Sequence, residues 1–108
     1  MKQVNVYFNF VRNQFIGVKE FSLEGKEICL DEYKKPDNDF SYEGEIKGLL
    51  VVGDFEVLVN CRGQNGFTWS VEIKIDGKPL TKEPITGKIG RRGISIHYES
   101  YPLPGEES

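Results

Sequence analysis

The strongest constraint on the fold is a strict alternation of apolar and polar residues that begins at Phe67. Side chains on a strand point alternately to its two faces, so the alternation places every second residue on one apolar face. These residues are Phe67, Trp69, Val71, Ile73 and Ile75. The preceding run, from Phe55 to Cys61, alternates in the same way. The two runs predict two strands with one buried face each, and they place Trp69 in the core.

The loop between the two runs predicts how they pair. A three-residue loop, 64–66, allows Gly66 to adopt the left-handed conformation that such loops require. This loop sets Cys61 opposite Trp69 and keeps apolar residues opposite apolar ones, whereas loops of two or four residues set apolar opposite charged side chains. The sequence therefore predicts a β-hairpin over residues 55–75.

Length and composition favour a small β domain. The chain has 108 residues, and its seven Phe, five Tyr and twelve Gly favour strands and tight turns over helices. We predict an all-β fold, a single-domain antiparallel β-sandwich or flattened barrel of about seven to eight short strands. The domain is expected to cover residues 1–100, followed by a flexible tail at 101–108.

Other strands are expected at residues 2–12, 15–23, 27–33, 43–52 and 94–99. Pro36 and several turn-forming residues predict an exposed loop at 34–42. The pair Asp76-Gly77 predicts a tight hairpin that sets Ile73 opposite Leu80.

The alternation in the last strand predicts which of its residues are buried. One set, expected in the core, is Ile94, Ile96 and Tyr98. The other set, expected on the polar face, is Ser95, His97 and Glu99.

The two cysteines and the N-terminus predict a cytoplasmic chain. The first ten residues already alternate as a strand, and they lack the apolar core and cleavage site of a signal peptide. No segment is apolar enough to span a membrane. We therefore expect Cys29 and Cys61 to be reduced and buried.

Neither an enzyme nor a metal site is expected. The chain has a single histidine, His97, and no motif that marks a nucleophile. One His and two distant Cys do not fit a zinc site. The segment 37–43 resembles the opening of a calcium loop, but Tyr42 stands where Gly is needed and Gly48 where the loop ends in Glu. We predict no cofactor.

A glycine-rich loop with Lys88, Arg91 and Arg92 is a candidate anion site. Glycines allow close backbone approach, and arginines donate in pairs to phosphate or carboxylate. The loop lacks the P-loop pattern. The net charge of −3 is small, but its distribution is uneven, with net −4 over residues 1–60 and net +3 over residues 61–100. Nucleic-acid binding by general basicity is therefore disfavoured, while a local basic site stays open.

An acidic stretch with interleaved aromatic residues, between Glu20 and Glu45, is the candidate binding surface. Carboxylates speed the encounter with a basic partner, and aromatic rings anchor it. The residues expected to bind are Asp31, Glu32, Tyr33, Asp37, Asp39, Phe40, Tyr42 and Glu43.

These features predict a small cytosolic protein that binds another protein, and the acidic stretch predicts that this partner is basic. The leading hypothesis is an inhibitor of the immunity or phage anti-defence type, which occludes its partner. One alternative is a ligand- or carbohydrate-binding β-sandwich module, which an exposed Tyr or Trp platform would favour. Another is a structural or oligomerising component, such as a phage particle protein, which would form a homo-oligomer through pairable sheet edges.

Overall fold

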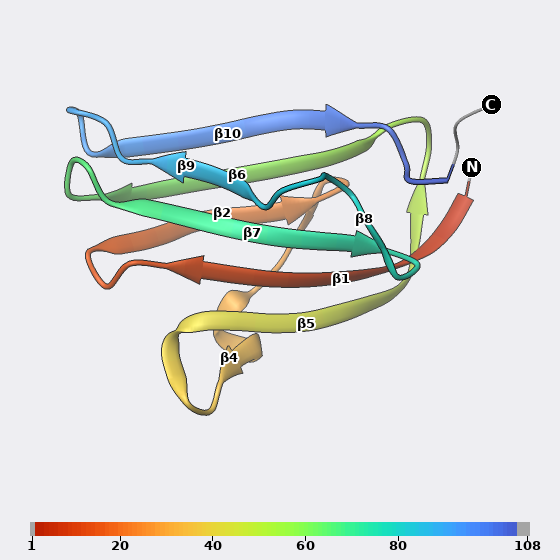
Figure 1. Cartoon of the computed structure of the whole chain (residues 1–108), viewed down its shortest axis with the longest axis horizontal. Helices are drawn as coiled ribbons and strands as arrows, with labels where there is room; N and C mark the ends of the chain where they lie inside the picture. The colour runs from red at the N-terminus through yellow and green to blue at the C-terminus, as the bar shows by residue number, and fades with distance from the viewer. Residues whose placement is uncertain (1, 106–108) are drawn as a thin grey trace.

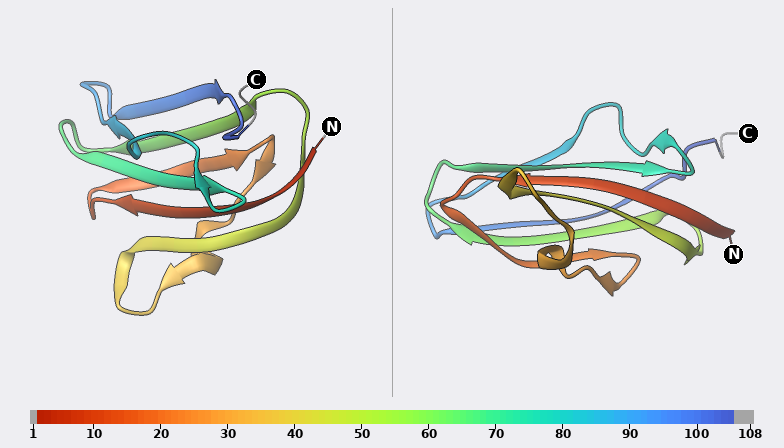
Figure 2. Two further views of the ribbon diagram at one scale, coloured as in Figure 1. Left: turned by 45° about the vertical axis from the view of Figure 1, so that its right-hand side comes forward. Right: turned by 90° about the horizontal axis from the view of Figure 1, so that it is seen from below.

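The computed structural model describes residues 2–105 as two antiparallel β-sheets packed face to face (Figures 1 and 2). Sheet A has the order β4-β5-β1-β7, with β8 and β9 both paired to β7, and sheet B has the order β10-β6-β2-β3. The predicted all-β sandwich is confirmed. In chain order the elements are β1 (Lys2–Arg12), β2 (Ile16–Leu23), β3 (Lys26–Glu27), the 3-10 helix η1 (Leu30–Tyr33), β4 (Lys34–Lys35), β5 (Asn38–Val51), β6 (Phe55–Gly63), β7 (Thr68–Ile75), β8 (Lys78–Pro79), β9 (Ile85–Lys88) and β10 (Ile94–Tyr101).

The core lies between the two sheets, and aromatic rings form its centre. The rings of Phe10 and Trp69 are stacked, with centroids 5.8 Å apart and planes 12° from parallel. Phe21 from sheet B meets Phe8 and Phe10 edge-on at 5.5 and 5.2 Å. Edge-to-face and offset-stacked contacts of this kind are the arrangements that aromatic rings prefer. The prediction of Trp69 as a core residue is confirmed.

The predicted hairpin over residues 55–75 is wrong. β6 lies in sheet B between β2 and β10, whereas β7 lies in sheet A beside β1. Residues 64–67 carry the chain from one sheet to the other, at one end of the sandwich (Figure 2, right). Both apolar faces are buried as expected, but they face each other across the core. Alternation identifies the buried face of a strand and leaves its hydrogen-bonded neighbour undetermined.

The second predicted hairpin, at Asp76-Gly77, is confirmed. Both residues have positive φ, 51° and 84°, as a type I′ turn requires. The backbone N–H of Leu80 donates to the carbonyl of Ile73 at 2.8 Å, so these residues are opposite each other.

Three segment boundaries differ from expectation. The predicted strand at 27–33 contains only the end of β3 and then η1. The predicted loop at 34–42 is a hairpin of β4 and β5. In the expected flexible tail, Tyr101 ends β10 and Leu103 is buried, while residues 106–108 lie outside the described part.

The expected faces of the last strand are reversed in β10. The hydroxyl oxygen of Ser95 accepts a hydrogen bond from Trp69 Nε1 at 3.0 Å, and His97 packs edge-on against the Trp69 ring. Ile96 and Tyr98 instead point outward, with 61% and 65% of their surface exposed. A buried indole N–H needs an acceptor. Ser95 supplies that acceptor, so Ser95 and His97 face inward, while the Glu99 side chain near the end of the strand is exposed.

The two cysteines are both free, but only one is buried. Cys61 lies in the core, and burial raises the pKa of its thiol to about 12. Cys29 is exposed, so the expectation that it is buried is wrong. Within residues 2–105, no helix has the length and apolar character needed to cross a membrane.

Candidate protein-binding surface

In the structure, the residues of the predicted acidic and aromatic segment lie in different environments. Tyr42 is only 3% exposed and meets Phe10 edge-on in the core, so its expected place on an exposed loop is wrong. Tyr33 is half-buried against Phe8, with ring centroids 5.2 Å apart. Phe40 remains partly exposed, and the Arg12 guanidinium lies 5.1 Å from the centre of its ring. Of the three predicted aromatic anchors, only Phe40 is exposed to solvent.

The predicted carboxylates also lie on separate elements. Asp31 and Glu32 are exposed in the first turn of η1. Asp37 is exposed in the β4–β5 turn, and Asp39 is exposed at the start of β5. Glu43 is exposed on β5. Among residues 2–105, no three His, Cys, Asp or Glu side chains are grouped so as to hold a metal ion.

Glu43 belongs to a polar surface that sheet pairing creates on the outside of sheet A. The register sets Asn9 of β1 between Glu43 of β5 and Glu72 of β7. The neighbouring row sets Tyr7 between Glu45 and Lys74. Directly opposed residues have Cβ atoms about 4.5–5.5 Å apart, so the side chains within each row are in reach of one another. We name the surface formed by Tyr7, Asn9, Glu43, Glu45 and Glu72 the acidic face.

Within the acidic face, the carboxylate of Glu43 is fixed by a hydrogen bond and by a neighbouring positive charge. The Tyr7 hydroxyl donates to the Glu43 carboxylate. Lys35 Nζ lies 4.0 Å from Glu43 Oε1, and Lys74 Nζ lies 5.6 Å from the centre of the Tyr7 ring. Glu43 therefore has a hydrogen-bond donor and a cation beside it. These contacts orient its carboxylate.

Asn9 differs, because its side-chain oxygen Oδ1 is buried and accepts no hydrogen bond from residues 2–105. A buried acceptor without a donor costs roughly 1–3 kcal/mol, and native proteins leave few of them. Its strand neighbours on both sides, Glu43 and Glu72, carry carboxylates. At the centre of the acidic face, the two exposed carboxylates therefore flank a buried amide, and a cationic donor from outside would complement the carboxylates.

The Tyr7 hydroxyl gives a pH-dependent signature of this arrangement. Burial, the hydrogen bond to Glu43 and the charges of Glu43 and Glu72 raise the pKa of Tyr7 to about 12. The folded state favours the neutral phenol, so the stability it contributes is full below about pH 10 and is lost as the pH rises towards 12. In urea titrations, Tyr7→Phe should therefore lose less stability than the wild type between these pH values. Equal losses would contradict the assignment.

The predicted anion loop forms the turn between β9 and β10. The N–H of Gly90 donates to Ile94 O at 3.2 Å, and the N–H of Gly93 donates to Gly90 O at 3.0 Å. Lys88, Arg91 and Arg92 are exposed around this turn. Anion binding by these three residues stays a prediction.

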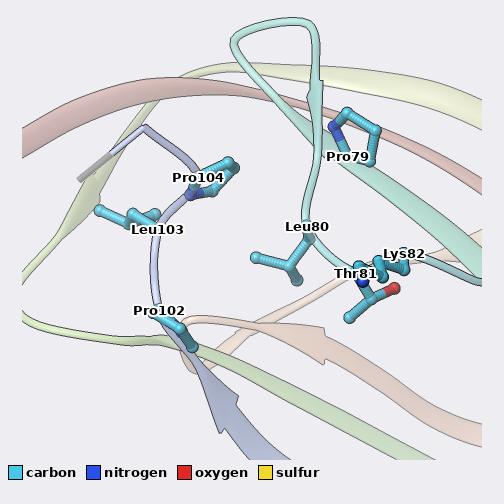
Figure 3. A pocket seen from close by; sticks show the side chains of 7 residues that line it. All are labelled: Pro79, Leu80, Thr81, Lys82, Pro102, Leu103 and Pro104. Carbon is cyan, nitrogen blue, oxygen red and sulfur yellow. The ribbon is translucent and has the colours of Figure 1, made fainter. Parts of the chain in front are cut away.

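An apolar groove of about 430 Å³ lies elsewhere, between the end of β8 and the C-terminal segment (Figure 3). Leu80 faces the segment Pro102–Pro104 across it, and Pro79 lies beside Leu80 in the lining. Lys82 is the one titratable side chain among the lining residues. The groove therefore brings together no pair of acid and base groups.

No protein-family model, curated protein or solved structure matches this chain. The functional argument accordingly rests on the geometry of the acidic face. Sequence reasoning missed Tyr7, Asn9 and Glu72, because they come from other strands and meet Glu43 only through the sheet register. The alternation in β1 indicates that Tyr7 and Asn9 lie on its polar face. The residues beside them on the neighbouring strands depend on the strand order, which the sequence pattern does not give.

Proposed function

We propose that this protein binds a basic partner protein through the acidic face and inhibits it by occlusion. The observation that carries the proposal is the pair of exposed carboxylates, Glu43 and Glu72, which the sheet register sets on either side of Asn9. An inhibitor of a basic nuclease-like enzyme, of the immunity or phage anti-defence type, is the function that this surface fits best.

An arginine or lysine of the partner would complement this site. Its N–H groups would donate to the exposed carboxylates of Glu43 and Glu72, and its charge would pair with them. Hydrogen bonds that involve a charged group are about twice as strong as neutral ones. Phe40 is three residues from Glu43 on β5, so its ring points to the other face of the strand, beside Arg12, and lies outside this surface.

The first experiment is affinity purification of the tagged protein from its native cells, with identification of bound proteins by mass spectrometry. We expect one stoichiometric basic protein. Recovery of the chain without such a partner would overturn the proposal.

A charge reversal then maps the surface. Glu72→Lys should weaken binding of the recovered partner by about a hundredfold, because it places a cation at the centre of the complementary site. Glu27→Lys in β3 makes the same charge change in a strand of the other sheet and is the matched control. Binding constants from titration calorimetry, at one ionic strength, measure both. Equal weakening by the two variants would show that net charge, and not the acidic face, determines affinity.

A second candidate function is an oligomerising component. The open edge of β10, with its exposed Ile96 and Tyr98, favours it. For a carbohydrate-binding module, Trp69 is buried and forms no platform, whereas Tyr98 is exposed with its hydroxyl bonded to Glu56.

A further inference from the structure

The free edge of β10 differs from the other sheet edges in the described part of the chain. Sheet A ends on β4, of two residues, and on β8 and β9, of two and four residues; sheet B ends on β3, of two residues, and on β10, of eight. β4 and β3 cover only parts of the outer edges of β5 and β2. The uncovered parts of these two edges each contain a bulge and a lysine, Lys47 in β5 and Lys19 in β2. Pro79 lies in β8, and Pro84 directly precedes β9. Short strands and prolines protect sheet edges from pairing with other chains. β10 contains no Pro, Lys or Arg, and its pairing with β6 has no bulge.

Hydrogen bonds at the start of β10 fix which backbone groups face outward. The carbonyl of Gly93 accepts from the N–H of Gly63 and so faces β6, whereas the carbonyl of Ile94 accepts from Gly90 on the opposite side. Backbone groups alternate in direction along a strand. The N–H and C=O groups of Ile96 and Tyr98 therefore face the open edge, where no residue within 2–105 pairs with them.

The same two residues present apolar side chains on the outer face of sheet B. Ile96 is 61% exposed and Tyr98 is 65% exposed. The Tyr98 hydroxyl donates to Glu56 Oε1 at 2.6 Å, and Leu58 is the β6 residue opposite Tyr98. This bond orients the Tyr98 ring. β10 thus offers unpaired backbone groups and an apolar strip at one edge, at the top of Figure 1.

We propose that β10 pairs antiparallel with β10 of a second copy of the chain, which joins the two sheets B into one continuous sheet. The register sets Ile96 opposite Tyr98 of the second copy, and the reverse, with His97 at the two-fold axis. Pairs of an aromatic and a β-branched residue are among the favourable cross-strand pairs. The edge groups of Ile96 and Tyr98 are then all hydrogen-bonded.

The charges at the two ends of β10 argue for a second copy as the occupant. Arg91 and Arg92 precede the strand, whereas Glu99 lies near its end and Glu56 is opposite Ser100. Antiparallel pairing brings the basic end of each copy towards the acidic end of the other, so the attraction occurs twice. The register also sets Glu99 of one copy opposite Ser95 of the other, so the two Glu99 carboxylates are kept apart.

The pairing makes a weak dimer with a defined shape. One eight-residue edge buries less than the roughly 1,600 Å² of a standard interface, so we expect a dissociation constant in the micromolar range. The two-fold axis is perpendicular to the paired sheet, so both acidic faces lie on the same side of the dimer. The dimer does not depend on the function proposed for those faces.

Sedimentation velocity between about 5 and 500 µM tests the dimer, over the range in which a micromolar dissociation constant shifts the population. The wild type should pass from monomer to dimer. Ile96→Lys places a charge on the edge and should raise the dissociation constant at least tenfold, in line with the protection that edge lysines give. Leu50→Lys changes a similarly exposed apolar residue, 55% exposed on β5, and should leave dimerisation unchanged. A monomer over the whole range, or equal behaviour of both variants, would overturn the proposal.

A second variant separates loss of the dimer from loss of the fold. Ile96→Pro removes an N–H that faces the open edge and none that pairs with β6, so the monomer should keep its strand content by circular dichroism. It should also fail to dimerise. A folded Ile96→Pro variant that dimerises like the wild type would overturn edge pairing.

Disulfide trapping tests the register. In a Cys29→Ser background, Ile96→Cys and Tyr98→Cys proteins are oxidised separately and as a mixture. Paired residues of this type have Cα atoms about 5.5 Å apart, within the range of a disulfide. We expect linked dimers only in the mixture. Linked dimers of a single variant alone would contradict the register.

Discussion

Replacing Trp69 with alanine should lower the free energy of unfolding by about 4 kcal/mol, near the upper part of the range for large-to-small core changes. The ring is 2% exposed, stacks on Phe10 and donates to Ser95 Oγ at 3.0 Å. The last contact joins sheet A to sheet B. Alanine would leave a cavity and an unpaired hydroxyl, and a typical domain has only about 5–15 kcal/mol to lose.

Urea denaturation followed by far-ultraviolet circular dichroism measures this loss, because Trp69 is the only tryptophan and fluorescence would vanish with it. Ser95→Ala is the matched control, since it keeps the ring packed and removes only the acceptor. It should cost about 1–3 kcal/mol, the penalty for an unsatisfied buried donor. If Ser95→Ala cost as much as Trp69→Ala, the hydrogen bond, and not the packing of the ring, would account for the effect.

The sequence predicted the buried faces of the strands well and their neighbours poorly. Val57 and Val71 are buried as the alternation requires, yet they lie in opposite sheets. Period-two patterning results from burial, which is the same whether the apolar face meets a strand beside it or a sheet across the core. The hairpin at Asp76-Gly77 was predicted correctly because its turn chemistry is local.

β10 shows why burial itself can be mispredicted. Its alternation favoured Ile96 as a core residue, but Trp69 needs a polar partner, and Ser95 faces inward to provide it. The requirement comes from a residue 26 positions away and leaves no trace in the local pattern. The acidic face likewise depends on residues that are far apart in the sequence. Glu43 was a predicted binding residue, whereas Asn9 and Glu72 join it only through the register of three strands.

Gly63 is where β6 leaves sheet B, and Gly63→Ala should cost about 3 kcal/mol, at the upper end for overpacking. An added Cβ would lie 2.3 Å from the carbonyl oxygen of Phe15 and 2.9 Å from Ile16 Cα. Both are backbone atoms at the start of β2, so no side-chain rotation relieves the clash. The N–H of Gly63 donates to Gly93 and that of Gln64 to Phe15, at 3.0 and 3.2 Å. The glycine is thereby held between two strands.

Gly17→Ala is the matched control for this prediction, because Gly17 lies in β2, the strand that pairs with the end of β6. Its nearest neighbour would be the carbonyl oxygen of Arg62 at 3.9 Å, an ordinary contact, and alanine there should be neutral or stabilise by about 0.5 kcal/mol. Urea unfolding followed by Trp69 fluorescence compares the two. Similar small changes would show that β2 and β6 can separate at this point without loss. A large loss at Gly63 alone would mean that close backbone contact fixes where the chain leaves sheet B, and hence that β7 enters sheet A beside β1 to complete the acidic face.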